Sequence, residues 1–149
     1  MTYFSKATGV PVPCSFEIYN YGPYSDRITF AVDSLLADEL LVDASTNPSK
    51  YSSYRLASQR LGFPEEIEKQ VRPHRSQIER VVESLGGFRP EQLELIATLH
   101  FLADKRRSQV GKRPLKAEVV RDFVRVKADK FKRAEVEGWY DALERAKLV

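Results

Sequence analysis

The segment SDRITFAVDSLLA, residues 25–37, begins the stretch of sequence that decides the fold class. Its apolar side chains recur at three- and four-residue steps, which predicts an amphipathic helix. Ser25 is expected to cap this helix through its hydroxyl, and Asp26 in the first turn is favoured by the helix dipole. The expected apolar stripe consists of Ile28, Val32, Leu35 and Leu36.

Two short segments follow, LLVDA at residues 40–44 and YSSYRL at residues 51–56, on either side of a polar loop that contains Asn47 and Pro48. Branched and aromatic residues around such a loop predict a β-hairpin. A helix that runs directly into a hairpin is the sequence outline of a winged helix-turn-helix, in which the hairpin is the wing. The predicted fold class is therefore mainly α with a small β-hairpin, built from winged helix-turn-helix-like units.

Upstream, residues 1–10 can form one or two helical turns, which Gly9 and the prolines that follow it end. Residues 14–19 (CSFEIY) alternate enough to predict a short strand. The Gly-Pro pair within residues 20–23 (NYGP) predicts a turn between this strand and the helix.

The rest of the chain predicts further helices. Proline in the first turn marks two of their starts, at Pro64 and Pro90, and Gly86-Gly87 marks an end. A loop is expected at residues 108–114. The helices are expected at residues 63–71, 75–85, 90–103, 116–127 and 133–146. Their inward residues are expected to be Ile78, Val81, Val82, Leu85, Leu93, Ile96, Leu99, His100, Phe101, Val119, Val120, Phe123, Val126, Val136, Trp139, Tyr140 and Leu143.

Residues 24–42 and 131–149 can be aligned without gaps, with an aromatic start, apolar residues at successive turns and a shared Leu-Val ending. We therefore expect two related units. Residues 1–60 would form a winged-helix-like unit, residues 61–87 would form connecting helices, and residues 88–149 would form a second helix-turn-helix-like unit without a wing.

Charge is distributed unevenly along the chain, although the formal net charge is only +3. Residues 1–88 hold 9 Lys/Arg against 11 Asp/Glu, and residues 89–149 hold 15 against 10, so the two parts differ as −2 against +5. The cations concentrate between Lys105 and Arg133. They can be a solvated surface, or they can bind phosphates or an acidic partner. The candidate binding residues are Lys105, Arg106, Arg107, Lys112, Arg113 and Lys116.

The segment FEIYNYGPYS, residues 16–25, followed by a helix and LLV at residues 40–42, resembles a family of small uncharacterised YwgA-like bacterial and archaeal proteins. It is more distantly similar to the Panacea antitoxin domain, in which an aromatic-x-Tyr-Gly-Pro turn precedes the helix. This resemblance implies an architecture and, through the distant relative alone, an antitoxin-like or phage-associated role. The turn motif carried over is Tyr21, Gly22, Pro23, Tyr24 and Ser25.

The family usually has a helical pair before the strand, of which residues 1–9 correspond only to the end. We therefore expect the apolar stripe of residues 25–37 to be partly uncovered and to be completed by a partner or a second copy. The side chains expected to form this homodimer contact are Tyr3, Phe4, Ile28, Val32 and Leu35.

The residues offer little for catalysis, for a metal or for a cofactor, and none of the three is predicted. His74 and His100 lack a second histidine at ligand spacing, and His100 fits a core position. Cys14 has no cationic neighbour in sequence, and no phosphate-binding glycine loop is present. The acids Glu65, Glu66 and Glu68 fit a helix start, and Tyr19, Tyr21 and Tyr24 fit core and turn positions better than a base-stacking platform.

With one cysteine, no signal peptide and no apolar run of membrane-spanning length, the chain is predicted to be cytoplasmic and not membrane-bound. The presumed recognition helices, residues 25–37 and 133–146, carry many acids, which would repel phosphates. We therefore expect a non-enzymatic regulatory protein that binds proteins. The alternative is a nucleic-acid-binding winged-helix transcriptional regulator, for which weak, sequence-indifferent contacts from the basic segment are expected.

Overall fold

The computed structural model describes residues 1–46, 52–57 and 64–149. The fold is mainly helical with small antiparallel hairpins, which confirms the predicted class. Two compact units make up the chain. Unit 1 contains residues 1–15 and 25–87, and unit 2 contains residues 16–24 and 88–149. The predicted loop at residues 47–50, together with Tyr51 and Phe63, lies outside the described residues.

Unit 1 contains helices and the hairpin predicted as a wing. Most helix bounds lie within two residues of the predicted ones, because the apolar periodicity and the flanking glycines and prolines mark them. The elements are α1 (Thr2–Ala7), α2 (Asp26–Ala37), β3 (Leu41–Asp43), β4 (Tyr54–Leu56), α3 (Glu65–Val71), η1 (Arg72–His74) and α4 (Arg75–Leu85).

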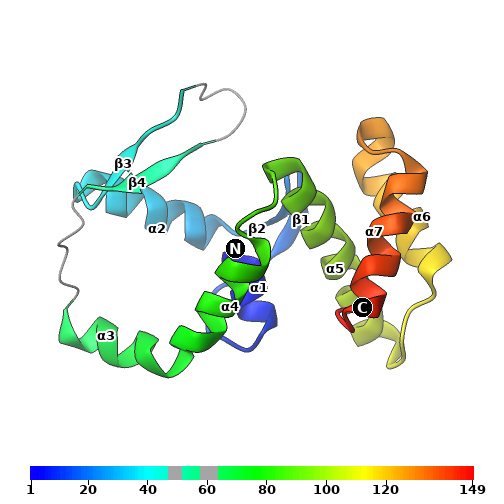
Figure 1. Ribbon diagram of the computed structural model, residues 1–149, viewed down its shortest axis with the longest axis horizontal. Coiled ribbons are helices and arrows are strands. Elements are labelled where there is room, and N and C mark those ends of the chain that lie inside the picture. Colours follow the sequence, from blue (N-terminus) through cyan, green and yellow to red (C-terminus); the bar gives the residue numbers. More distant parts are fainter. Residues whose placement is uncertain (47–51, 58–63) are drawn as a thin grey trace. The chain divides into compact units, whose positions relative to one another are not determined.

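The strands β3 and β4 pair antiparallel, with Leu41 opposite Leu56 and Asp43 opposite Tyr54. A carboxylate oxygen of Asp43 accepts the Ser45 backbone N–H at 2.8 Å, which turns the chain away from the strand. The strand β3 follows α2 closely and packs against it (Figure 1). This helix-to-hairpin order is compatible with a winged helix-turn-helix.

The start of α2 corrects one expectation. Ser25 occupies the N-cap position in an extended conformation, but its side chain makes no capping hydrogen bond. The chain before α2 is held differently, because the Arg27 guanidinium donates to the Pro13 carbonyl at 2.6 Å and the Lys6 ammonium donates to the Cys14 carbonyl.

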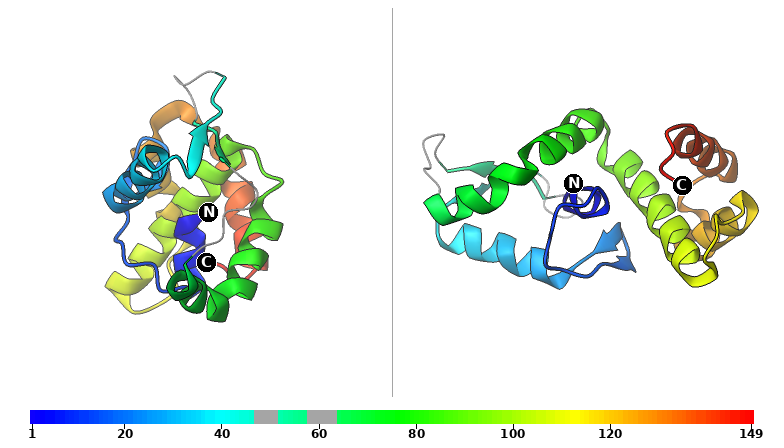
Figure 2. Two further views of the ribbon diagram at one scale, coloured as in Figure 1. Left: turned by 90° about the vertical axis from the view of Figure 1, so that its left-hand side faces the viewer. Right: turned by 90° about the horizontal axis from the view of Figure 1, so that it is seen from below.

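Unit 2 contains a second hairpin and the longer helices. The elements are β1 (Glu17–Tyr19), β2 (Gly22–Tyr24), α5 (Pro90–Val110), α6 (Lys116–Lys127), η2 (Ala128–Lys130) and α7 (Arg133–Arg145). The helices α5, α6 and α7 pack against one another, and β2 packs on α5 (Figures 1 and 2). The predicted strand at residues 14–19 is therefore shorter. The predicted turn is observed at Asn20 and Tyr21, but Gly22 and Pro23 belong to a second strand that pairs with β1, which the sequence did not predict.

Most of the residues expected in the core of unit 2 are buried, but several positions differ from the prediction. Val119, Val120 and Phe123 of α6 are buried as predicted, whereas Val126 is exposed and Lys127 is buried in its place. The helix α5 continues to Val110, so the predicted loop begins later, at the left-handed Gly111. The buried face of α5 also differs, because it contains Leu95 and Leu102 and leaves Leu93 and Phe101 half-buried. The other buried core residues include Ile96, Leu99, Val136, Tyr140 and Leu143.

The division of the chain differs from the predicted one in two places. Residues 16–24 group with unit 2, although they precede α2 in the sequence. Residues 61–87 were expected to be separate connecting helices, and they group with unit 1.

Candidate functional site

The helix α2 is the least buried long helix in the described part of the chain. None of its 12 residues is buried. Ile28, Val32 and Leu35, which the sequence assigned to self-association, are half-buried, and Phe30 is 68% exposed. An amphipathic helix with an incompletely covered apolar stripe is a candidate contact surface, because buried apolar area is the main driving force of association.

The amino-terminal part of the expected contact is not available. Phe4 is only 7% exposed and lies within unit 1, where α1 packs against α4. The ring of Tyr3 meets the Phe4 ring edge-on, with centroids 5.2 Å apart. Phe4 is therefore a core residue, and the assignment of this side chain to an open face is wrong.

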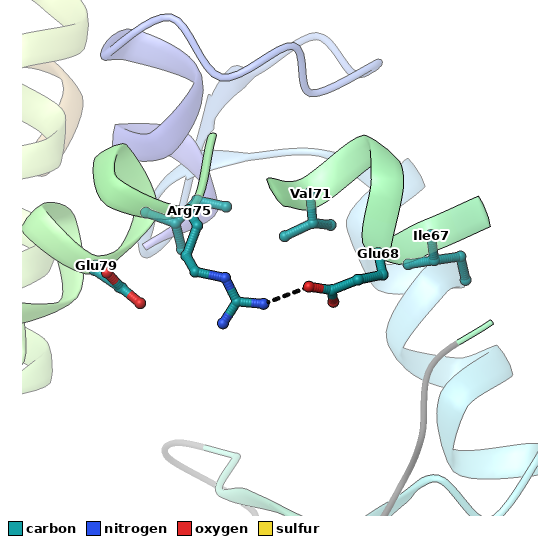
Figure 3. A pocket seen from close by; sticks show the side chains of 6 residues that line it. Ile67, Glu68, Val71, Arg75 and Glu79 are labelled. Carbon is teal, nitrogen blue, oxygen red and sulfur yellow. Dashed lines mark hydrogen bonds and ion pairs between the residues drawn. The ribbon is translucent and has the colours of Figure 1, made fainter. Parts of the chain in front are cut away.

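A second apolar surface of unit 1 lies between α3 and α4. The side chains of Ile67, Val71 and Ile78 line a groove of about 340 Å³. Figure 3 shows Glu68 of α3 reaching across to Arg75 of α4, and the two form an ion pair at 2.9 Å. No residue of α3 is buried, so α3 exposes apolar side chains as α2 does.

In unit 2, three of the six basic residues predicted to bind phosphates are in ion pairs. The Arg106 guanidinium lies 2.5 Å from an Asp122 carboxylate oxygen and 3.3 Å from one of Glu118. This guanidinium holds the pKa of Asp122 below its ordinary value of 3.8. The other two pairs are Arg113 with Glu144 at 2.7 Å and Lys116 with Asp141 at 2.5 Å.

The remaining three predicted cations, Lys105, Arg107 and Lys112, are exposed and form no ion pair with any residue that the structure describes. Neutralised cations bind phosphate weakly, since the internal carboxylate competes with the ligand. The sequence could not show this, because the partners lie between 12 and 31 residues away. The basic segment therefore offers fewer phosphate contacts than its composition indicates.

The turn motif at residues 21–25 begins in the β1–β2 hairpin. Tyr19, Tyr21 and Tyr24 are exposed, so none of them is the expected core residue, whereas Tyr21 does lie in a turn as expected. The Lys130 ammonium lies 4.8 Å from the centre of the Tyr21 ring, a cation–π contact. Gly22 has a φ of 105°, which only glycine adopts readily, and a Cβ there would lie 3.3 Å from the Thr98 hydroxyl.

Beneath this hairpin lies a buried charge network that the sequence did not predict. The side chains of Glu94 and Lys127 are 2% and 3% exposed and meet at 2.9 Å. Lys130 also donates to both carboxylate oxygens of Glu94, at 2.8 and 2.7 Å. Lys127 donates as well to the backbone carbonyls of Tyr19 and Asn20, at 3.3 and 2.7 Å. We call Glu94, Lys127 and Lys130 the hairpin anchor, because they hold the β1–β2 hairpin on α5 and α6.

The residues considered for catalysis do not come together. His100, expected to be a core residue, is half-buried, and its partial burial lowers its pKa; His74 contacts Gln77 at 3.1 Å. Cys14 is buried and free. Within the described ranges, no group of three or more His, Cys, Asp or Glu side chains could hold a metal ion. Glu65, Glu66 and Glu68 lie in the first turn of α3, as the helix-start interpretation expects.

Comparison with known proteins adds no relative. No protein-family model, curated protein or solved structure matches this chain. Of the helices in residues 1–46, 52–57 and 64–149, none has both the length and the apolar character of a membrane span.

Proposed function

We propose that this protein is a non-enzymatic regulatory protein that acts through protein–protein contacts. The observation that carries the proposal is the exposure of α2, which has an apolar stripe and no buried residue. Exposed apolar side chains on β4 and α3, including Leu56 and Ile67, extend the apolar surface that unit 1 offers. Apolar side chains at the centre of a contact provide most of the binding free energy between proteins.

The first partner to test is a second copy of the chain. Wild-type protein should sediment as a dimer at tens of micromolar. Val32 lies in the apolar stripe, and Val32→Ser should weaken the dimer at least about tenfold, because burying the rest of a branched apolar side chain in the contact is worth about 1.4 kcal/mol. Phe30→Ser is the matched control, since Phe30 is 68% exposed but lies on the face of α2 opposite the stripe. A wild-type monomer, or equal effects of the two substitutions, would count against a contact through α2.

Nucleic-acid binding is the second candidate, and the exposed cations Lys105, Arg107 and Lys112 favour it. If these three residues contact phosphates, the slope of log affinity against log salt should be about −0.9 for each contact, hence about −3 in total. The reversals Lys105→Glu and Arg107→Glu should then weaken binding equally for all sequences. A nanomolar preference for one operator would make this candidate the first.

An antitoxin-like or phage-associated setting, within the cytoplasm, forms part of the proposal through the resemblance of residues 21–25 alone. A protein of either kind acts by occupying a partner, which agrees with a binding role. The absence of retardation of random duplex at low salt, where phosphate contacts are strongest, would leave protein binding as the candidate.

A further inference from the structure

Unit 2 carries a groove between α5 and α6 that the proposed contact through α2 does not use. Its volume is about 350 Å³. The two helices pack directly against each other, and Leu102 at the base of the groove is almost fully buried. The groove therefore already exists before a ligand binds. The lining residues are Leu102, Lys105, Arg106, Gln109, Asp122, Arg125 and Val126.

The charge of this groove is positive. It contains three cations and one acid, and the acid is already occupied, because Asp122 lies 2.5 Å from the Arg106 guanidinium. The other two cations, Lys105 and Arg125, are exposed and have no ion pair with any side chain that the structure places. An anionic ligand can therefore bind Lys105 and Arg125 without breaking an internal pair.

The groove is also partly apolar. Val126 is 42% exposed, although the apolar periodicity of α6 predicted it to be inward, and it lies beside Leu102 and the side chains of the two cations. A duplex backbone presents phosphates and sugar C–H groups but no branched aliphatic side chain of the kind that packs on a valine. A peptide segment that carries leucine between carboxylates can cover Val126 and neutralise the cations together.

We propose that the α5–α6 groove binds an acidic amphipathic segment of a partner protein, with carboxylates on Lys105 and Arg125 and an apolar side chain on Val126. This inference rests on the proposed function, since its ligand is a protein. It names the chemistry of a partner at a surface separate from α2. Arginine is suited to the task because its guanidinium can bind both oxygens of one carboxylate.

The test uses the full chain and a synthetic twelve-residue peptide in which leucines at positions i and i+4 lie between glutamates. Isotope-labelled protein is titrated with the peptide, and the amide signals of residues 102–109 and 122–126 are followed. Those signals should shift, and Lys105→Glu/Arg125→Glu should weaken binding at least about tenfold, since two charge contacts become repulsive. A peptide with glutamine in place of glutamate should lose a similar factor.

The matched control is Lys112→Glu/Lys147→Glu, which changes the net charge equally at exposed cations outside the groove. It should weaken peptide binding less than about threefold, because only long-range attraction is lost. Equal weakening by both double variants would overturn the proposal, and so would unshifted groove signals at millimolar peptide. Tighter binding of duplex DNA or inorganic phosphate than of the peptide at the same residues would also overturn it.

The two proposals fail separately. Sedimentation of Val32→Ser tests the α2 contact and does not involve the groove. If the peptide leaves the groove unshifted while wild-type protein still dimerises through α2, the groove proposal is wrong and the proposed function stands. If wild-type protein is monomeric but the peptide shifts the groove signals, the contact through α2 is wrong and the groove proposal stands.

Discussion

The hairpin anchor gives the sharpest test of how unit 2 is held together. Lys127→Met removes the buried ammonium but keeps a side chain of similar length. Among the described residues, the Glu94 carboxylate, which is 2% exposed, then keeps Lys130 as its ion-pair partner. Removing one partner of a buried ion pair typically costs about 3–5 kcal/mol, because the other charge remains desolvated. Since Lys130 still donates to Glu94, we expect the lower end, about 3 kcal/mol.

Glu94→Gln should cost at least as much, because the Lys127 ammonium then keeps only the two carbonyls of the hairpin and the amide oxygen as acceptors. The double variant Glu94→Gln/Lys127→Met should be more stable than the sum of the single effects indicates, by at least about 1 kcal/mol, because no buried charge is left unpaired. Unfolding in urea can be followed by the fluorescence of Trp139, the single tryptophan, which lies in α7 and meets the Phe88 ring edge-on.

The matched control for the anchor is Arg133→Met in α7, within the same unit as Trp139. Its partner Glu137 lies at a similar distance, 2.8 Å, but the two side chains are 72% and 38% exposed. Exposed pairs of this kind contribute about 0.3–0.5 kcal/mol, so the control should have little effect. A loss below about 1 kcal/mol for Lys127→Met would refute the view that this buried pair holds the hairpin on the helices.

Three further outcomes are expected. The pKa of Asp122 is lower in the folded state than its ordinary value of 3.8, so its carboxylate stabilises the fold above pH 3.8, and this stabilisation is lost as the pH falls through the pKa of the folded state. The stability of Asp122→Asn should therefore depend less on pH in the acid range. Burial lowers the pKa of His100, so the stability of the wild type should fall as the pH drops below 6.5. In His100→Gln, the urea midpoint of unfolding should change less between about pH 7.5 and 5.5. Gly22→Ala should cost about 1–2 kcal/mol by urea unfolding, because φ is 105° and the added Cβ meets Thr98.

Sequence reasoning succeeds where the signal is local and repeated. The helix at residues 116–127 is observed with the predicted bounds, because its apolar residues repeat over three turns. The hairpin of β3 and β4 follows from branched and aromatic residues around a polar loop. By contrast, β2 has three residues and contains Pro23, so it has no periodicity to read and its pairing depends on contacts with α5.

The missed members of the hairpin anchor show why a charge pattern alone misleads. Lys127 lies four residues after the buried Phe123, and Glu94 lies four residues before the buried Thr98. Both positions therefore belong to buried helix faces. The charge pattern groups Lys127 with the cations of the basic segment and predicts no role for Glu94, although a buried charge is acceptable when an opposite charge faces it. Position on the helix could have found each residue, but only the fold brings together partners that are 33 residues apart.

The alignment of residues 24–42 with 131–149 has a consequence for α2. Shifted by this alignment, α2 corresponds to residues 133–144, which lie within α7. Both helices carry an apolar stripe, yet α7 fully buries Val136, Tyr140 and Leu143, whereas the stripe of α2 is only half-buried. The same local pattern is thus satisfied in α7 by α5 and α6, and in α2 it is not satisfied within the described chain. Because apolar area left in water costs about 25 cal/mol per Å², α2 retains a driving force for association that α7 has already used in folding.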